Sequence, residues 1–133
     1  MKVLLPVVLG LSLCAGCAAE IGDECGANVD CSPNGDRVCD TSMSGGYCTI
    51  TGCRAGTCPE EAVCVAWDTG VAERALCMRS CGSSSDCRDG YQCFDPRAYW
   101  DAHHDDPGYE EDDYGVVLPR DPPSRAKFCT QNW

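Results

Sequence analysis

The cysteines constrain this chain more than any other feature of its sequence. Fourteen of them occur in 133 residues, a density typical of small exported proteins held together by disulfides. Cysteines at this density are rare in the cytosol, where thiols are kept reduced. Structural zinc is the alternative, but the only C-x-x-C pair joins Cys14 to Cys17, and the only histidines are the neighbours His103 and His104. The sequence therefore predicts a disulfide-bonded protein in an oxidising compartment.

Residues 1–16 have the pattern of a signal peptide. Lys2 precedes an apolar run from Val3 to Leu13, and this run is too short to span a bilayer as a permanent helix. We therefore expect these residues to direct export and to be absent from the mature protein.

Cys17 is the predicted lipidation site. Ala15-Gly16-Cys17, directly after the apolar run, resembles the lipobox of bacterial lipoproteins, although Cys14 stands where Leu is usual. The resemblance implies that Cys17 is acylated, becomes the first residue of the mature chain and anchors it in the membrane. Ala18 rather than Asp follows it, which resembles lipoproteins of the outer membrane and implies a place in the cell envelope. The alternative is cleavage after Ala19, which would give a freely secreted extracellular protein.

The twelve cysteines that follow Cys17 allow six disulfides with no thiol left over. They form three groups of four, in residues 25–48, 53–77 and 81–133. Flanking residues repeat too, because Cys25-Gly26 with Asp30-Cys31 has its counterpart in Cys81-Gly82 with Asp86-Cys87. Agreement of spacing and flanking residues indicates copies of one small unit.

The predicted fold is small and disulfide-rich, with three tandem four-cysteine β-hairpin units, little regular secondary structure and no large core. The third and fourth cysteines of a unit lie in short β-forming stretches, such as Ala62 to Trp67, with turn-forming residues between them. A unit of this size cannot bury enough apolar surface to fold alone. Disulfides must supply the stability, about 3 kcal/mol for a loop of about 15 residues. Residues 17–24 are expected to be a tether.

Four cysteines allow three pairings within a unit. We favour first with third and second with fourth, since this pairing ties the cysteine-bearing loop to both hairpin strands, although spacing alone leaves the other pairings open. The predicted disulfides are Cys25–Cys39, Cys31–Cys48, Cys53–Cys64, Cys58–Cys77, Cys81–Cys93 and Cys87–Cys129.

The third unit resembles a known family. Cys81-Gly82-Ser83-Ser84-Ser85-Asp86-Cys87 followed by Arg88-Asp89-Gly90-Tyr91-Gln92-Cys93 is similar to the N-terminal cysteine-rich domain of Dickkopf proteins. The first unit has two extra residues before Cys39, and the second has one fewer before Cys58. The resemblance implies a fold and no signalling role.

Residues 94–128 form the longest interval between cysteines and are the candidate binding loop. Seven of the thirteen residues from Asp101 to Asp113 are acidic and none is basic. Prolines and charges disfavour regular structure here, while aromatic side chains offer contact surface. Such a loop can bind a cationic protein or a divalent cation, and His103 with His104 is a weaker candidate for a transition metal because no third ligand is placed. The alternative is that these residues are a solvated insertion with no ligand. The residues that we select for binding are Tyr99, Trp100, Asp105, Asp106, Tyr109, Glu110 and Glu111.

The charge and the absence of catalytic motifs limit the classes of function that this chain can have. A net charge of −11 excludes nucleic acid as a partner. No G-x-S-x-G, H-E-x-x-H or phosphate-binding glycine loop occurs, so we expect neither an enzyme nor a cofactor. The predicted function is that of a membrane-anchored extracytoplasmic binding protein. The alternatives are a structural envelope lipoprotein without a specific ligand and a freely secreted protein that inhibits proteases or binds metal.

Overall fold

The computed structural model describes residues 18–68, 73–107, 115–118 and 125–131. Strands predominate among them and helix is sparse, as predicted for a small disulfide-rich protein. The elements in chain order are α1 (Asn28–Cys31), β1 (Val38–Cys39), β2 (Cys48–Thr49), β3 (Ala62–Asp68), β4 (Glu73–Cys81), the 3-10 turn η1 (Ser84–Asp86), β5 (Tyr91–Phe94), α2 (Pro96–His103), β6 (Val116–Val117) and β7 (Lys127–Gln131).

Six disulfides join the cysteines in each group first to third and second to fourth, which is the connectivity favoured from the sequence. Their Cα atoms lie 5.3–5.9 Å apart, within the range that a disulfide spans. The third and fourth cysteines of each group also face each other across an antiparallel strand pair. These facing pairs are Cys39 and Cys48, Cys64 and Cys77, and Cys93 and Cys129.

One five-stranded sheet, in the order β5-β7-β4-β3-β6, contains strands of both the second and the third groups. This differs from the expectation of separate tandem hairpins. The reason is that β4 runs on for nine residues and carries Cys77, the last cysteine of the second group, and Cys81, the first of the third. Its first part pairs with β3, and its end pairs with β7 through Ser80 and Cys81. A single strand thereby serves two units.

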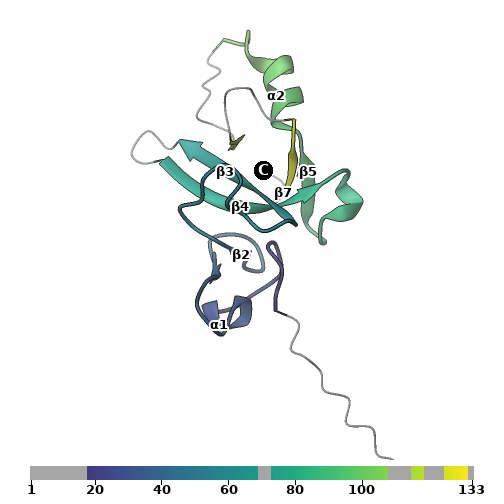
Figure 1. Ribbon diagram of the computed structural model, residues 1–133. Coiled ribbons are helices and arrows are strands. Elements are labelled where there is room, and N and C mark those ends of the chain that lie inside the picture. Colours follow the sequence, from purple (N-terminus) through teal and green to yellow (C-terminus); the bar gives the residue numbers. More distant parts are fainter. Residues whose placement is uncertain (1–17, 69–72, 108–114, 119–124, 132–133) are drawn as a thin grey trace, which may run out of the picture.

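A shared core stands where no large core was expected. It is formed by Val65, Leu76 and Met78 of the central strands, Phe128 of β7 and Tyr47 of the first group, each at most 3 % exposed. The first group, with β1, β2 and α1, lies below the sheet in Figure 1 and contributes Tyr47 to this core. The disulfides therefore reinforce apolar packing that crosses all three groups.

Residues 19–23, predicted to be part of a tether, are packed into the fold. Ile21 is fully buried in the core. The Gly22 amide donates to the Cys48 carbonyl at 2.9 Å, and the Cys48 amide donates to the Asp23 carbonyl at 3.0 Å. We call residues 19–23 the strap. The tether prediction missed it because a single apolar residue, Ile21, carries no periodicity that sequence analysis could detect.

Arg88 fastens the first group to the third. Its guanidinium donates to the carbonyls of Gly22 at 3.1 Å, of Ser44 at 2.7 Å and of Gly46, and lies 4.2 Å from the centre of the Tyr91 ring. The Tyr91 hydroxyl accepts from the same guanidinium at 2.7 Å and donates to the Ser44 carbonyl at 2.9 Å. The cation therefore holds loops from two disulfide units together through charge-assisted hydrogen bonds.

The loop between the first and second cysteines has the same geometry in the first and third groups. The Asp30 carboxylate accepts from the amides of Gly26 and Ala27 at 2.8 and 2.9 Å. The Asp86 carboxylate accepts from the amides of Gly82 and Ser83 at 2.8 and 2.9 Å. These backbone donors stabilise the charged form and lower the pKa of both aspartates.

Candidate binding surface on helix α2

Helix α2 lies within residues 94–128, the candidate binding loop, where no regular structure was expected. Asp95 caps its first turn by accepting from the Ala98 amide at 3.0 Å. Pro96 occupies the first position of the helix, where a backbone N–H would have no partner within the helix, so its absence in proline costs nothing. Arg97 and Asp101 form an i,i+4 ion pair at 3.2 Å. The expectation was wrong for these residues because acidic composition was weighed above the Asp-Pro start signal.

Two aromatic–histidine pairs line α2. The Trp100 and His104 rings stack with their centres 4.2 Å apart and their planes at 9°, and Tyr99 lies 4.5 Å from His103. Arg97 places its guanidinium 5.0 Å from the Trp100 ring. Both pairs follow the i,i+4 spacing, which brings side chains together on one helix face. The helix therefore presents ordered rings rather than the loose aromatic residues expected of a loop.

The base of α2 joins the helix to the core. Phe94, at the end of β5, lies 5.6 Å from the Tyr99 ring and 5.5 Å from the Phe128 ring. Lys127 of β7 pairs with Asp95 at 3.3 Å. Neither Phe94 nor Arg97 was selected as a binding residue from the sequence. Asp95 followed by Pro96 is a helix start signal that would have placed both residues beside the first turn of a helix.

The two histidines serve different partners. His103 Nδ1 lies 2.9 Å from an Asp106 carboxylate oxygen, whereas His104 Nδ1 donates to the Trp100 carbonyl at 2.9 Å. Neighbouring residues on a helix point about 100° apart, so the pair does not converge on one ion. The clusters of three potential metal ligands found among the described residues consist of disulfide cysteines. Within that part of the chain, the histidines are better explained by their ring contacts, His104 stacked on Trp100 and His103 tilted against Tyr99, than by metal ligation.

The acidic side chains gather at the end of α2. Asp101, Asp105 and Asp106 are all exposed. Asp105 and Asp106 are among the predicted binding residues, as are Tyr99, which is 38 % exposed, and the half-buried Trp100. These four lie in α2 or within three residues of its end. The remaining three, Tyr109, Glu110 and Glu111, lie outside the described residues, as does Cys17.

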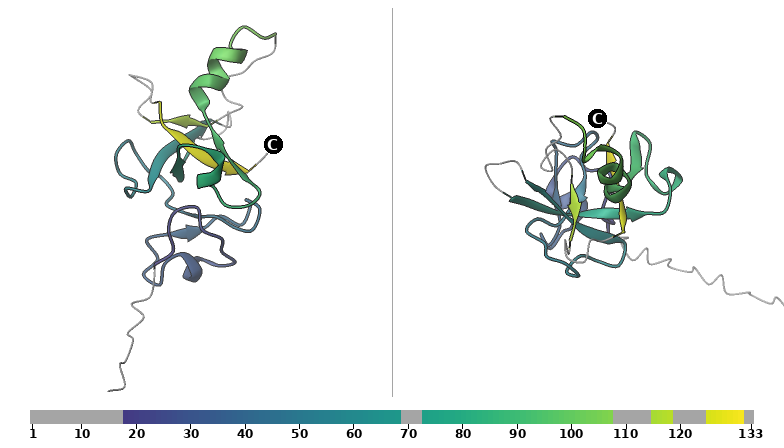
Figure 2. Two further views of the ribbon diagram at one scale, coloured as in Figure 1. Left: turned by 90° about the vertical axis from the view of Figure 1, so that its right-hand side faces the viewer. Right: turned by 90° about the horizontal axis from the view of Figure 1, so that it is seen from above.

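Helix α2 projects from one end of the molecule. Figure 1 and the left view of Figure 2 both place it beyond the five-stranded sheet, while α1 and the beginning of the described chain at Ala18 lie at the other end. The right view of Figure 2 shows the helix over the sheet, seen nearly along its axis. Helix α2 and the beginning of the described chain therefore lie at opposite ends of the molecule.

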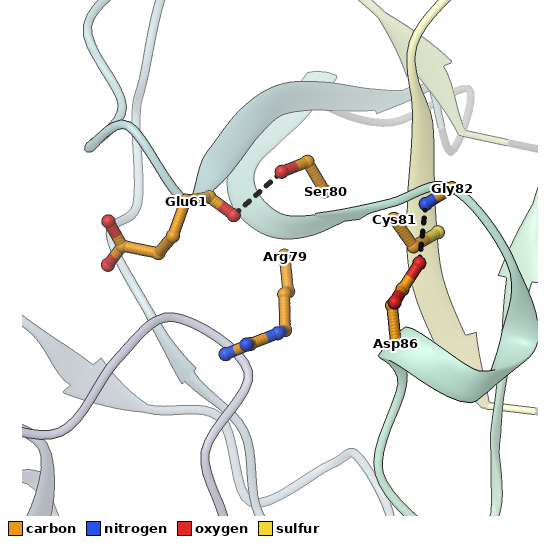
Figure 3. A pocket seen from close by; sticks show the side chains of 6 residues that line it. All are labelled: Glu61, Arg79, Ser80, Cys81, Gly82 and Asp86. Carbon is orange, nitrogen blue, oxygen red and sulfur yellow. Dashed lines mark hydrogen bonds between the residues drawn. The ribbon is translucent and has the colours of Figure 1, made fainter.

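A second surface feature is a hollow between strand β4 and the η1 loop, shown in Figure 3 and lined by Glu61, Arg79, Ser80, Cys81, Gly82 and Asp86. Its polar groups are turned to neighbours within the fold. The Ser80 hydroxyl donates to the Glu61 carbonyl at 2.9 Å, and Asp86 accepts from the Gly82 amide. Arg79 pairs with Glu20 of the strap at 2.8 Å. The hollow thus connects structural elements and offers less to a ligand than α2 does.

Searches with the chain found no matching protein family, no significantly similar curated protein and no significantly similar solved structure. Among the described residues, no helix has both the length and the apolar character needed to span a membrane.

Proposed function

We propose that this protein is a lipid-anchored, extracytoplasmic binding protein of the cell envelope that presents helix α2 to a partner. The observation that carries the proposal is the position of α2, at the end of the molecule opposite Ala18. An acyl anchor at Cys17 would be attached next to Ala18, so α2 would stand farthest from the membrane. The disulfides would keep this presentation rigid in an oxidising compartment.

A cationic protein surface is the partner that fits α2 best. Exposed Asp101, Asp105 and Asp106 lie on α2 or directly after it, on the same segment as Tyr99 and Trp100, and the chain as a whole carries a net charge of −11. Aromatic side chains give contact area at small entropic cost, while carboxylates steer a basic partner to them. A divalent cation is less well supported, because the described carboxylates and histidines do not converge.

We further propose that the three four-cysteine groups are copies of one ancestral unit. Support comes from the same disulfide connectivity in each group and from third and fourth cysteines that face each other in all three strand pairs. The matching loops around Asp30 and Asp86 add an independent likeness. The resemblance of the third unit to the Dickkopf cysteine-rich domain remains a prediction.

Hydrogen exchange of the full mature protein tests the binding role. Detergent-solubilised envelope proteins of the source cell serve as the probe, and the exchange of backbone amides in residues 97–106 is the readout. We expect these amides to be protected in the wild type and unprotected in the variant Tyr99→Ala/Trp100→Ala. The control is Val29→Ala, which removes an apolar side chain that is 69 % exposed at the other end of the molecule.

Salt dependence separates an ionic partner from nonspecific apolar adhesion. Raising the ionic strength to about 1 M shortens the screening length to about 3 Å, so protection by a cationic partner should be lost. If the amides of residues 97–106 exchange at the same rate with and without envelope proteins, the binding role is refuted and the structural envelope protein becomes the better account. Protection that persists in Tyr99→Ala/Trp100→Ala would place binding elsewhere.

A further inference from the structure

We infer that the folded body rests directly on the bilayer, with the end that carries α1 against the lipid headgroups. The inference rests on the proposed lipidation of Cys17 and adds to it a defined contact surface and a fixed orientation. It follows from the strap, which leaves almost no free chain between the anchor and the fold.

The strap is held in place from its first residue. The Ala19 carbonyl accepts from the Arg37 guanidinium, and Ala19 packs against the buried cluster of Cys25, Cys31 and Cys48. The next residue, Glu20, pairs with Arg79 at 2.8 Å. Ile21, which follows, is fully buried. The body therefore begins at Ala19.

The covalent reach from the anchor is short. Cys17 and Ala19 are two residues apart, so even an extended chain separates them by about 7 Å. The headgroup region on each side of a bilayer is about 5–8 Å deep. An acylated cysteine at the boundary between headgroups and acyl chains would thus hold Ala19 within the headgroup region or at its outer edge. A body that starts there has no room to float free of the surface.

The end of the molecule that would meet the lipid is the one formed by the first disulfide group. Figure 1 and the left view of Figure 2 place α1 beside the beginning of the described chain. Val29 of α1 is 69 % exposed, and among the described residues it is the most exposed large apolar side chain. The Asp30 and Asp36 carboxylates of this region are bonded to neighbouring groups, Asp30 to two amides and Asp36 to the Ser32 hydroxyl. The exposed apolar side chain of Val29 suits the interface of a bilayer, while the Asp30 and Asp36 carboxylates keep their charge and would stay among the polar headgroups.

Amine labelling of the lipidated protein tests this orientation. Lys2 and Lys127 are the lysines of the chain, and Lys2 belongs to the leader. The variant Val29→Lys/Ala102→Lys/Lys127→Arg therefore carries one lysine at each end of the molecule and keeps a cation beside Asp95. The protein is reconstituted in phosphatidylcholine vesicles, exposed to a membrane-impermeant amine-reactive reagent and digested, and labelling at positions 29 and 102 is compared by mass spectrometry with labelling in detergent.

We expect position 29 to lose its labelling in vesicles and to regain it in detergent, while position 102, exposed on α2, labels in both. A flexible Gly/Ser insertion of about ten residues between Ala18 and Ala19 lets the body move about 17 Å from its anchor, and should restore labelling at position 29. Equal labelling of both positions in vesicles, with the protein still membrane-bound, would overturn the orientation and leave lipidation intact. Protein that does not stay with the vesicles would overturn the lipid anchor and the inference with it.

Discussion

Replacing Arg88 with methionine should loosen the first disulfide group from the sheet. The side chain keeps much of its length but loses every donor. Arg88 reaches the carbonyls of Gly22, Ser44 and Gly46. Ser44 keeps a bond from the Tyr91 hydroxyl, whereas Gly22 and Gly46 are buried and lose the donor that Arg88 supplies.

The expected cost follows from these two carbonyls. A hydrogen bond from a charged donor contributes about 1.5–3 kcal/mol, and a buried acceptor left unpaired costs about 1–3 kcal/mol. Two such losses predict a destabilisation of about 3–4 kcal/mol, a large share of the 5–15 kcal/mol typical of a small domain. The amides of Cys25 and Gly46, which bond to Gly45 and Met43, should exchange faster than those of the sheet.

Urea unfolding followed by tryptophan fluorescence measures this cost, with disulfides intact and with Cys17→Ala to keep the protein free of lipid. The control is Arg54→Met, because Arg54 is exposed and its loss should cost no more than about 0.5 kcal/mol. A free energy of unfolding for Arg88→Met that equals that of Arg54→Met would refute the reasoning.

Three further changes test other parts of the fold. Thr130→Val should stabilise the protein by about 1 kcal/mol in urea unfolding, because the buried hydroxyl of Thr130 has no hydrogen-bond partner among the described residues; a loss of stability would show that it does have one. Gly115→Ala should lower the free energy of unfolding by about 1–3 kcal/mol, since a Cβ there would lie 2.6–2.7 Å from side-chain atoms of β3. Gly26→Ala should be nearly neutral, because the nearest atom to a Cβ at that position is an Asp30 carboxylate oxygen at 3.6 Å. The lowered pKa of Asp86 predicts stability that is present above about pH 4, near the pKa of an unperturbed aspartate, and lost as the pH falls through the folded-state pKa. In Asp86→Asn the urea midpoint should therefore fall less steeply as the pH drops below about 4, and a pH dependence equal to that of the wild type would contradict this.

The cysteine pattern predicted more of the architecture than any other feature. Spacing and flanking residues pointed to hairpins, and the pairing of first with third and second with fourth cysteines was favoured because it ties the loop to both strands, although spacing left the other two pairings of each group open. The continuity of β4 could not be foreseen in the same way, because Cys77 and Cys81 were assigned to different units by counting. Strand pairing between Ser80 and Phe128 joins residues that are far apart in sequence, and no local signal predicts such a contact.

The candidate site was chosen from its acidic and aromatic composition, but its helical conformation was not predicted. Tyr99 and Trp100 were expected to be parts of an irregular loop, whereas both lie in helix α2. Asp95 and Pro96 together are a helix start signal that acts through backbone geometry, whereas acidic composition influences solubility. The buried strap escaped prediction for a related reason: Ile21 is fixed by tertiary packing alone.

The intact mass of the mature protein, extracted from membranes and measured before and after reduction with alkylation, tests the account most directly. We predict a chain that starts at Cys17 and carries acyl chains, with twelve alkylations that appear only after reduction. A chain that starts at Glu20 without lipid would contradict the anchor and the orientation that depends on it, and alkylation before reduction would contradict the six disulfides.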